Sequence, residues 1–392
     1  MRRWALGLLK NETVLVVAAV IALISCLFVL PDKQYAGYIH YNTLAQLGSL
    51  MVVVCGFQRI GVFHLIGSNL LARVHTVRGL VLVLTALPFF SSMLITNDVA
   101  LVTFIPFAIA VLIMAGMQER TFLVATLMTL GANLGSMFTP IGNAHNLYLK
   151  ARSDIPTTEF LAIMAPYTLL AALMLCLVIW CTFGKEQASI LQDLEARRIQ
   201  ESVLAPEQDS IQPQVQVAPC EGWRLAVYGA LFMVCLLGVG GILPQWVMVL
   251  IVAAGFFLCD WRVFLQVDWG LLLTFVAFFI FIGNARRIPE FYNLVSGLVG
   301  HYPLLTSVIS SQVISNVPTS LLVSGFSTAW RQIIVGTNLG GLGTLIASMA
   351  SLISYKAVVK KYPGSKGRYL KVYTLWNVIF LLVLLALALL IE

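Results

Sequence analysis

The sequence predicts an all-α polytopic membrane protein made of two inverted repeats, with two re-entrant hairpins, two broken transmembrane helices and about nine spans. Of its 392 residues, 59% are hydrophobic and 10% charged, and the mean hydropathy is +0.92. Apolar runs of about 20 residues, the length that crosses a bilayer as a helix, recur along the chain. The alternating segments of about 10 residues that make a membrane β-barrel do not occur. The net charge of +7 is therefore a topology signal and gives no indication of nucleic-acid binding.

One short polar stretch, residues 91–100, lies inside the long apolar run from Gly79 to Gly116. It reads Ser-Ser-Met-Leu-Ile-Thr-Asn-Asp-Val-Ala and contains Asp98. A carboxylate at membrane depth costs several kcal/mol unless something pairs with it. The sequence therefore marks Asp98 as a functional-site candidate.

The pattern around this stretch occurs twice in the chain, in the same order each time. An ordered set of matches indicates an internal duplication, and apolar segments interrupted by Gly and Asn in both halves indicate a binding site at mid-membrane. The matches are Thr96-Asn97-Asp98 with Ser315-Asn316-Val317, residues 131–135 and Thr139-x-Ile141 with residues 336–340 and Thr344-x-Ile346, and Arg59-Ile60-x-x-Phe63 with Arg287-Ile288-x-x-Phe291.

The first half is expected to contain a hairpin and a broken span. Each hairpin arm is about 24 Å long as a helix, which favours a re-entrant hairpin, with two short full spans as the alternative. Gly and Pro between residues 131 and 143 are expected to break the helix that follows. In order, the predicted elements are an uncleaved first span 13–30, an outer loop 31–41, a span 43–58, an interfacial segment 61–74, hairpin arms 79–95 and 99–115, the broken span 121–150 and a span 158–183.

The second half follows the polar segment 185–221, which is rich in Gln and Pro in its second part and is predicted to be a linker. The predicted elements are spans 222–243, 245–259 and 269–284, an interfacial segment 289–300, a hairpin 303–329, the broken span 332–358 and a last span 372–391. The predicted units are an N-terminal repeat half 1–183, a cytoplasmic linker 184–221, a connecting span 222–245 and a C-terminal inverted repeat half 246–392.

The distribution of Lys and Arg predicts the orientation of these spans. With the N-terminus in the cytoplasm, 18 of the 24 Lys and Arg lie inside and the C-terminus lies outside. The first hairpin then enters from the cytoplasm and the second from outside. The seven cysteines show neither metal-site nor redox spacing.

The two hairpin tips and the two helix breaks are the predicted site. Helix N-termini favour anions, unwound carbonyls coordinate cations, and Asn97 and Asn316 offer both a carbonyl and an amide. The simpler interpretation is that Asn and small residues hold helices together. For Asp98 the alternatives are a proton or Na⁺ site and a structural ion pair with Arg59, although an interfacial anchor is the preferred role for Arg59 and for Arg287. His145 is expected to be packed or pore-lining, with titration near neutral pH as the alternative.

At these residues the chain resembles the ion transporter superfamily, which includes arsenite permeases, NhaD-type sodium/proton antiporters and divalent anion/sodium symporters. The resemblance extends over nearly the whole chain except residues 185–221. In the dicarboxylate carriers of that superfamily, both tips have a sequence similar to Ser-Asn-Thr. This chain has Asp98 and Val317 at the positions of the two threonines. A carboxylate beside an anionic substrate is unfavourable by Coulomb's law, so the departure favours the branch of arsenite permeases and NhaD-type antiporters.

The resemblance also implies which residues form the site, with substrate held between the two tips. The implied substrate-binding residues are Thr96, Asn97, Asp98, Ser315, Asn316 and Val317. The implied ion-coupling residues are Asp98, Ser92, Asn97, Gly131 and Asn133 in the first half, and Ser311, Asn316, Gly336 and Asn338 in the second.

The sequence thus predicts a secondary active transporter of a small inorganic ion or oxyanion, coupled to H⁺ or Na⁺ and working by antiport or efflux in the bacterial inner membrane. It does not predict an enzyme, since it contains no His-Glu-x-x-His motif, and it contains no phosphate-binding Gly-x-x-x-x-Gly-Lys-Ser/Thr motif. No cofactor is expected beyond a bound Na⁺; the bilayer and a second copy of the chain, as a homodimer, are the expected partners. The alternatives are a sodium-coupled carboxylate or sulfate symporter and a passive channel.

Overall fold

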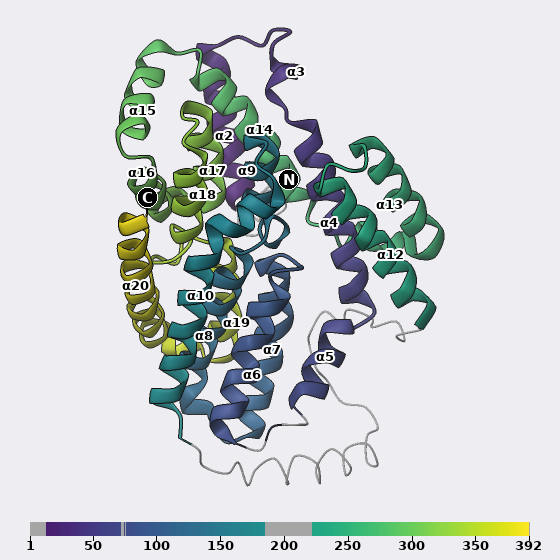
Figure 1. The fold of residues 1–392 in the computed structure, drawn as a ribbon, viewed down its shortest axis with the longest axis vertical. Helices are drawn as coiled ribbons and strands as arrows, with labels where there is room; N and C mark the ends of the chain where they lie inside the picture. The colour runs from purple at the N-terminus through teal and green to yellow at the C-terminus, as the bar shows by residue number, and fades with distance from the viewer. Residues whose placement is uncertain (1–12, 72–73, 75, 185–221, 392) are drawn as a thin grey trace.

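The computed structural model describes residues 13–71, 74, 76–184 and 222–391, and within these ranges the chain forms helices and no strands. Figure 1 shows the helices as one elongated bundle. The all-helical prediction is confirmed. The predicted linker 185–221 and the N-terminal residues 1–12 lie outside the described residues.

The first half contains two helices that meet at the predicted tip, followed by a broken helix. The re-entrant path of the hairpin stays a prediction, since α7 is also long enough to be a full span. The hairpin arms meet at residues 92–96, and the second arm begins at Asn97. The helices are α2 (Thr13–Phe28), α3 (Tyr35–Tyr38), α4 (Tyr41–Arg59), α5 (Val62–Leu71), α6 (Val77–Ser91), α7 (Asn97–Met114), α8 (Thr121–Ser136), α9 (Ala144–Ser153) and α10 (Thr157–Thr182), with 3₁₀ turns at Gln118–Arg120 and Pro140–Gly142.

The second half repeats this order of long helices, short surface helix, hairpin, broken helix and last span. Its hairpin turns at Ser315 and its broken helix is interrupted at residues 340–348. The helices are α12 (Gly222–Val239), α13 (Gln245–Asp260), α14 (Trp269–Ala285), α15 (Pro289–His301), α16 (Pro303–Ile314), α17 (Asn316–Phe326), α18 (Trp330–Leu339), α19 (Met349–Lys361) and α20 (Lys366–Ile391), with 3₁₀ turns at Trp261–Leu265 and Pro363–Ser365.

Several helices are long and apolar enough to cross a bilayer. Among the described residues five meet this test, in α7, α10, α12, α13 and α20, or six if α14 and α15, which are bent by 104°, form one span. Large apolar side chains on their outer faces are exposed, Leu258 by 84% and Leu390 by 85%, as expected for contact with lipid. The protein is therefore an integral, multi-pass membrane protein, and the count of nine spans stays a prediction.

Glycines beside the two breaks lie where helices cross closely: Gly131, Gly135 and Gly336 lie within helices, and Gly340 directly follows α18. We expected Gly131-Ala132-Asn133 to belong to the interruption, but α8 continues to Ser136 and the break begins at Met137. The reason is packing against α6: a Cβ on Gly135 would lie 1.9 Å from the Phe89 carbonyl oxygen. In the second half, a Cβ on Gly340 would lie 2.6 Å from the Ser311 hydroxyl of α16.

The ends of four long helices are joined across the halves, since α2 packs on α14 and α4 packs on α13. Arg59, at the end of α4, pairs through Nε with Asp260 at the end of α13, at 2.6 Å, and both side chains are almost buried. The alternative of an ion pair with Asp98 is therefore wrong, because Arg59 pairs with Asp260. Its role as an interfacial anchor stays a prediction. The long side chain of Arg59, at the end of α4, reaches the buried carboxylate of Asp260 on the neighbouring helix α13.

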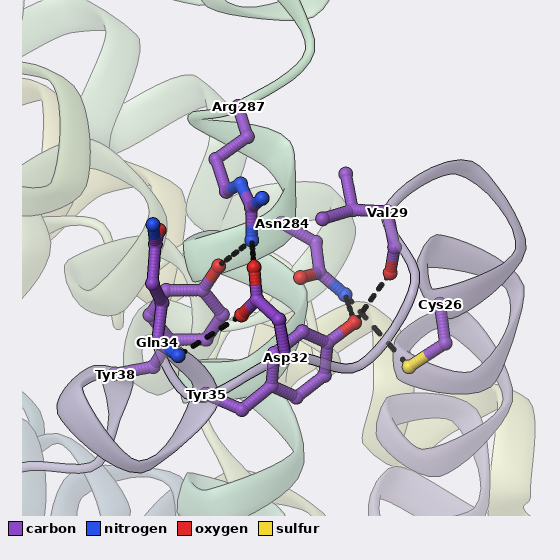
Figure 2. A network of polar contacts seen from close by, with 8 residues as sticks. All are labelled: Cys26, Val29, Asp32, Gln34, Tyr35, Tyr38, Asn284 and Arg287. Carbon is purple, nitrogen blue, oxygen red and sulfur yellow. Dashed lines mark hydrogen bonds and ion pairs between the residues drawn. The ribbon is translucent and has the colours of Figure 1, made fainter.

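The equivalent arginine of the second half, Arg287, makes the equivalent ion pair with Asp32, which Figure 2 shows. Arg287 donates to Asp32 at 2.8 Å and to the Tyr38 hydroxyl at 3.0 Å. These hydrogen bonds, with that of Tyr38 the larger contribution, raise the pKa of Arg287 above its usual value. Asn284 donates to the Tyr35 hydroxyl at 2.8 Å and fixes the same loop to α14. Repeat-related arginines thus hold the two halves together at both ends.

Candidate functional site

The two hairpin tips each place a buried asparagine at the start of a helix. Asn97 opens α7 and Asn316 opens α17, and they are 2% and 4% exposed. The Asn97 amide donates to Asn133 Oδ1 at 2.9 Å, and its own Oδ1 accepts the backbone N–H of Asp98 at 3.0 Å. The backbone N–H of Asn316 donates to the Ala347 carbonyl at 2.9 Å. Each tip is therefore tied to a broken helix.

A chain of hydrogen bonds joins the two tips to each other. Asn133, which accepts from Asn97, also accepts from the Ser348 hydroxyl at 3.2 Å. Ser348 follows Ala347, whose carbonyl accepts from Asn316. The tips, far apart in sequence, thus meet through one polar network that both helix breaks complete.

Two repeat-related contacts support this network from the broken helices. Asn133 Nδ2 donates to the Ser351 hydroxyl at 3.4 Å, and Asn338 Nδ2 donates to Asn146 Oδ1 at 2.7 Å. Tyr373 donates to Ser351 at 2.6 Å. Ser351, Asn146 and Ser348 are not among the site residues that the sequence predicts. Their equivalent positions in the two repeats were the signal that could have identified them.

Four helices start at this network, namely α7, α9, α17 and α19. Their N-cap residues are Thr96, Asn143, Ser315 and Ser348, and none of these side chains caps its own helix. The first-turn N–H groups of a helix carry partial positive charge and bind anions when no side chain satisfies them. The arrangement therefore produces a field that favours negative charge or an electron-rich oxygen.

The tip of the second hairpin has a backbone conformation that the first lacks. Ser315 has φ +75° and ψ 156°, whereas Thr96 has φ −66°. A non-glycine residue with positive φ is strained and persists only where its surroundings hold it. The Ser315 hydroxyl donates to the Ala347 carbonyl at 3.3 Å, which helps to hold this turn.

The helix breaks are attached to the hairpins by matching threonines. The Thr139 hydroxyl donates to the Met93 carbonyl, and the Thr344 hydroxyl donates to the Gln312 carbonyl at 3.1 Å. In the second half the Gln312 amide also donates to the carbonyl of Gly340 at 3.0 Å. The predicted equivalence of Thr139 and Thr344 thus corresponds to one contact made twice.

The predicted serines and glycines lie at the helix crossings beside this network. Ser92 and Ser311 are fully buried, and their hydroxyls donate within their own helices, to Phe89 at 3.0 Å and Ser307 at 2.7 Å. Gly131 and Gly336 face the backbones of α6 and α16. A Cβ on Gly131 would lie 3.0 Å from the Thr85 carbonyl oxygen, and one on Gly336 would lie 2.7 Å from the Leu304 carbonyl oxygen. Their role in ion coupling stays a prediction.

Asp98 lies half-buried in the first turn of α7, where its carboxylate has neither a hydrogen bond nor an ion pair within the described part of the chain. Val317, its counterpart on α17, is 8% exposed. Among the residues that the structure describes, no cation is therefore paired with the extra charge of the first tip.

Similarity to known proteins identifies the family of this chain. A family model described as a citrate transporter matches residues 4–329. The chain belongs to this family. It is also 32% identical over 329 residues to the inner membrane protein YbiR of Escherichia coli, which covers 83% of this chain and 82% of that protein.

Two further relatives are named as transporters. An uncharacterized transporter of Methanocaldococcus jannaschii is 29% identical over 353 residues, 89% of this chain and 90% of the relative. A silicon efflux transporter of Oryza sativa subsp. japonica, LSI3, is 33% identical over 158 residues, 40% of this chain and 31% of that protein. The prediction of a membrane transporter is confirmed, whereas the arsenite-permease or NhaD-type branch stays a prediction.

Proposed function

We propose that the protein is a secondary active transporter that moves a small inorganic ion or oxyanion across the bacterial inner membrane, coupled to H⁺ or Na⁺ and working by antiport or efflux. The observation that carries this proposal is the network in which both hairpin tips and both helix breaks meet. Discontinuous helices with their N-termini at one site bind anions, and the adjacent unwound carbonyls bind cations. Such a site lies between two hairpins that alternate in access to water.

Asp98 supports the coupling. Its carboxyl group, which has no hydrogen bond or ion pair among the described residues, lies at the positive end of α7. The helix end stabilises the charged form, while burial favours the neutral form. These opposing influences suit a group that gains and loses a proton or Na⁺. In this proposal Asn97, Asn133, Asn316 and Asn338 hold the ions and the substrate.

The proposed orientation is an inverted repeat with the N-terminus in the cytoplasm and the C-terminus outside. It is supported by α6 and α7, which lie in the lower part of Figure 1, and by α16 and α17, which lie in its upper part. Cysteines introduced at Gln118, in the turn before α8, and at Thr328, in the turn before α18, test it. Labelling by an impermeant reagent from outside should occur at residue 328 alone; labelling of both would contradict the orientation.

A sodium-coupled carboxylate or sulfate symporter is the second candidate, favoured by the family's description as citrate transporters. Asp98, which forms no ion pair within the described residues, counts against a multiply charged anion, because like charges repel most strongly in a low dielectric. Relatedness to a silicon efflux transporter supports a small oxygen-rich species. A passive channel would need neither paired hairpins nor a coupling carboxylate.

Purified protein in liposomes tests these functions directly. Arsenite, silicate, sulfate, citrate and Na⁺ would each be offered under imposed pH or Na⁺ gradients. The proposal expects saturable flux of arsenite or silicate that follows one gradient. Gradient-driven citrate or sulfate uptake would favour the symporter, and non-saturable flux would favour a channel.

A further inference from the structure

The first turn of α9 contains a histidine whose polar atoms are not used. His145 is 0% exposed, and neither ring nitrogen has a hydrogen-bond partner of normal geometry in the described ranges of the chain. The Asn338 side chain lies beside the ring, and the next residue, Asn146, bonds that same amide at 2.7 Å. Buried polar groups are nearly always paired, so the ring nitrogens of His145, beside these helix N-termini, are candidates for binding a ligand.

A second orphan lies on the helix that packs against α9. Thr319, in the first turn of α17, is 0% exposed and its hydroxyl has no partner among the residues that the structure describes. Helices α9 and α17 are in contact, and Tyr148 of α9 and Ser324 of α17 share a hydrogen bond of 2.9 Å. The same pair of helices thus carries both unpaired groups.

The repeat supplies an internal comparison for this pair. Residues equivalent to His145 and Thr319 are Ala350 of α19 and Ala100 of α7, both fully buried. Helices α19 and α7 also pack together. Alanine is therefore compatible with the same helix crossing, and folding does not require polar side chains at these two positions.

We infer that His145 and Thr319 bind a hydroxyl group of the transported species at the crossing of α9 and α17. A neutral imidazole and a threonine hydroxyl each offer a donor and an acceptor, which an O–H group satisfies together. A bare cation would use only the acceptors and a fully deprotonated anion only the donors. The ligand class is a small oxyacid that keeps at least one proton, and the inference rests on the proposed function in taking this network as the substrate site.

Ligand-dependent thermal stability of the purified protein tests the inference without any ion gradient, because a ligand that binds the folded state stabilises it. Arsenite, borate and silicate at neutral pH are the hydroxyl-bearing probes, and nitrate and sulfate are the probes without a proton. His145→Ala and Thr319→Val should each weaken binding of the first group about tenfold or more, the effect of one hydrogen bond, and leave nitrate and sulfate unchanged. His145→Gln, which keeps a donor and an acceptor, should restore most of the binding.

Thr337→Val is the matched control, because Thr337 is equally buried but its hydroxyl bonds Ile333 of its own helix at 2.7 Å. It should bind every probe as the wild type does. Wild-type affinity in both His145→Ala and Thr319→Val, equal losses for all probes, or no binding of hydroxyl-bearing probes by the wild type would overturn the inference. Dependence on His145 together with no gradient-driven flux in liposomes would instead contradict the proposed function.

Discussion

The two hairpin-and-break units are built by the same contacts but differ in a few side chains at their helix N-termini. Thr139 and Thr344 attach equivalent breaks to equivalent hairpins, and the amides of Asn133 and Asn338 donate to equivalent residues of the opposite half. Glycines permit the same close helix crossing in each unit. Contacts present twice are explained by the fold, since either unit needs them.

The differences have no such explanation. Asp98 is set against Val317, His145 against Ala350 and Thr319 against Ala100. In each pair the apolar member shows that the polar group is not needed for packing. The comparison therefore separates the side chains that build the site from those that give it chemistry.

The largest expected effect is on the shared asparagines of the two tips. Asn97→Ala and Asn316→Ala should each abolish transport in liposomes while expression and elution of the purified protein stay near normal. Asn97→Ala removes the hydrogen bond to Asn133, and Asn316→Ala removes the side-chain amide that lies beside Gly341. Transport at the wild-type rate by either variant would mean that the two tips do not hold one ligand.

The two inter-half ion pairs should differ in their contribution to stability. Asp260→Asn leaves Arg59 buried without its counter-charge, and removal of one partner of a buried pair costs about 3–5 kcal/mol. Asp32→Asn should change stability little, because Arg287 and Asp32 are 36% exposed and reach solvent. Chemical or thermal unfolding in detergent would compare them, and equal losses would refute the distinction.

Smaller losses are expected at the helix crossings. Gly135→Ala and Gly340→Ala each force a methyl group against a hairpin helix, and overpacking of this kind costs about 1–3 kcal/mol. Gly229→Ala in α12 is the control, since a Cβ there meets no atom within 4 Å. Melting temperatures should fall for the first two variants only. An unchanged melting temperature for Gly135→Ala would show that the crossing relaxes readily.

Much of the fold was predictable because each half contains polar residues that interrupt its apolar runs. The tips at Asn97 and Asn316 follow from polar residues inside apolar runs, and the helices that begin there start where the pattern indicated. The break after α8 was placed too early, because glycine weakens a helix in isolation but is retained where two helices cross closely. Local sequence does not reveal which of these roles a glycine has.

The pairing of side chains across the halves was less predictable. An ion pair with Asp98 was one alternative for Arg59, whereas its partner in the structure, Asp260, lies on a helix about 200 residues away in the chain. The bonds of Ser348 and Asn146 to Asn133 and Asn338 depend on how the halves meet. The sequence also does not reveal that the ring nitrogens of His145 have no hydrogen-bond partner among the described residues.

The central claim is that side chains unique to one half carry the chemistry of transport, and Asp98 tests it most directly. Asp98→Asn keeps the size and hydrogen-bonding ability of the side chain and removes its titratable charge. Two fluxes would be measured in liposomes with the same protein, uptake driven by an H⁺ or Na⁺ gradient and exchange of labelled for unlabelled substrate without a gradient. Asp98→Val, which copies Val317, is the matched second variant.

We predict that both variants fold as the wild type does, lose gradient-driven uptake, and retain an exchange that no longer depends on the coupling ion. Circular dichroism and gel filtration of the purified proteins would establish the first point before flux is compared. Wild-type gradient-driven uptake by a well-folded Asp98→Asn protein would contradict the account, and would assign the Asp98 carboxylate to structure alone.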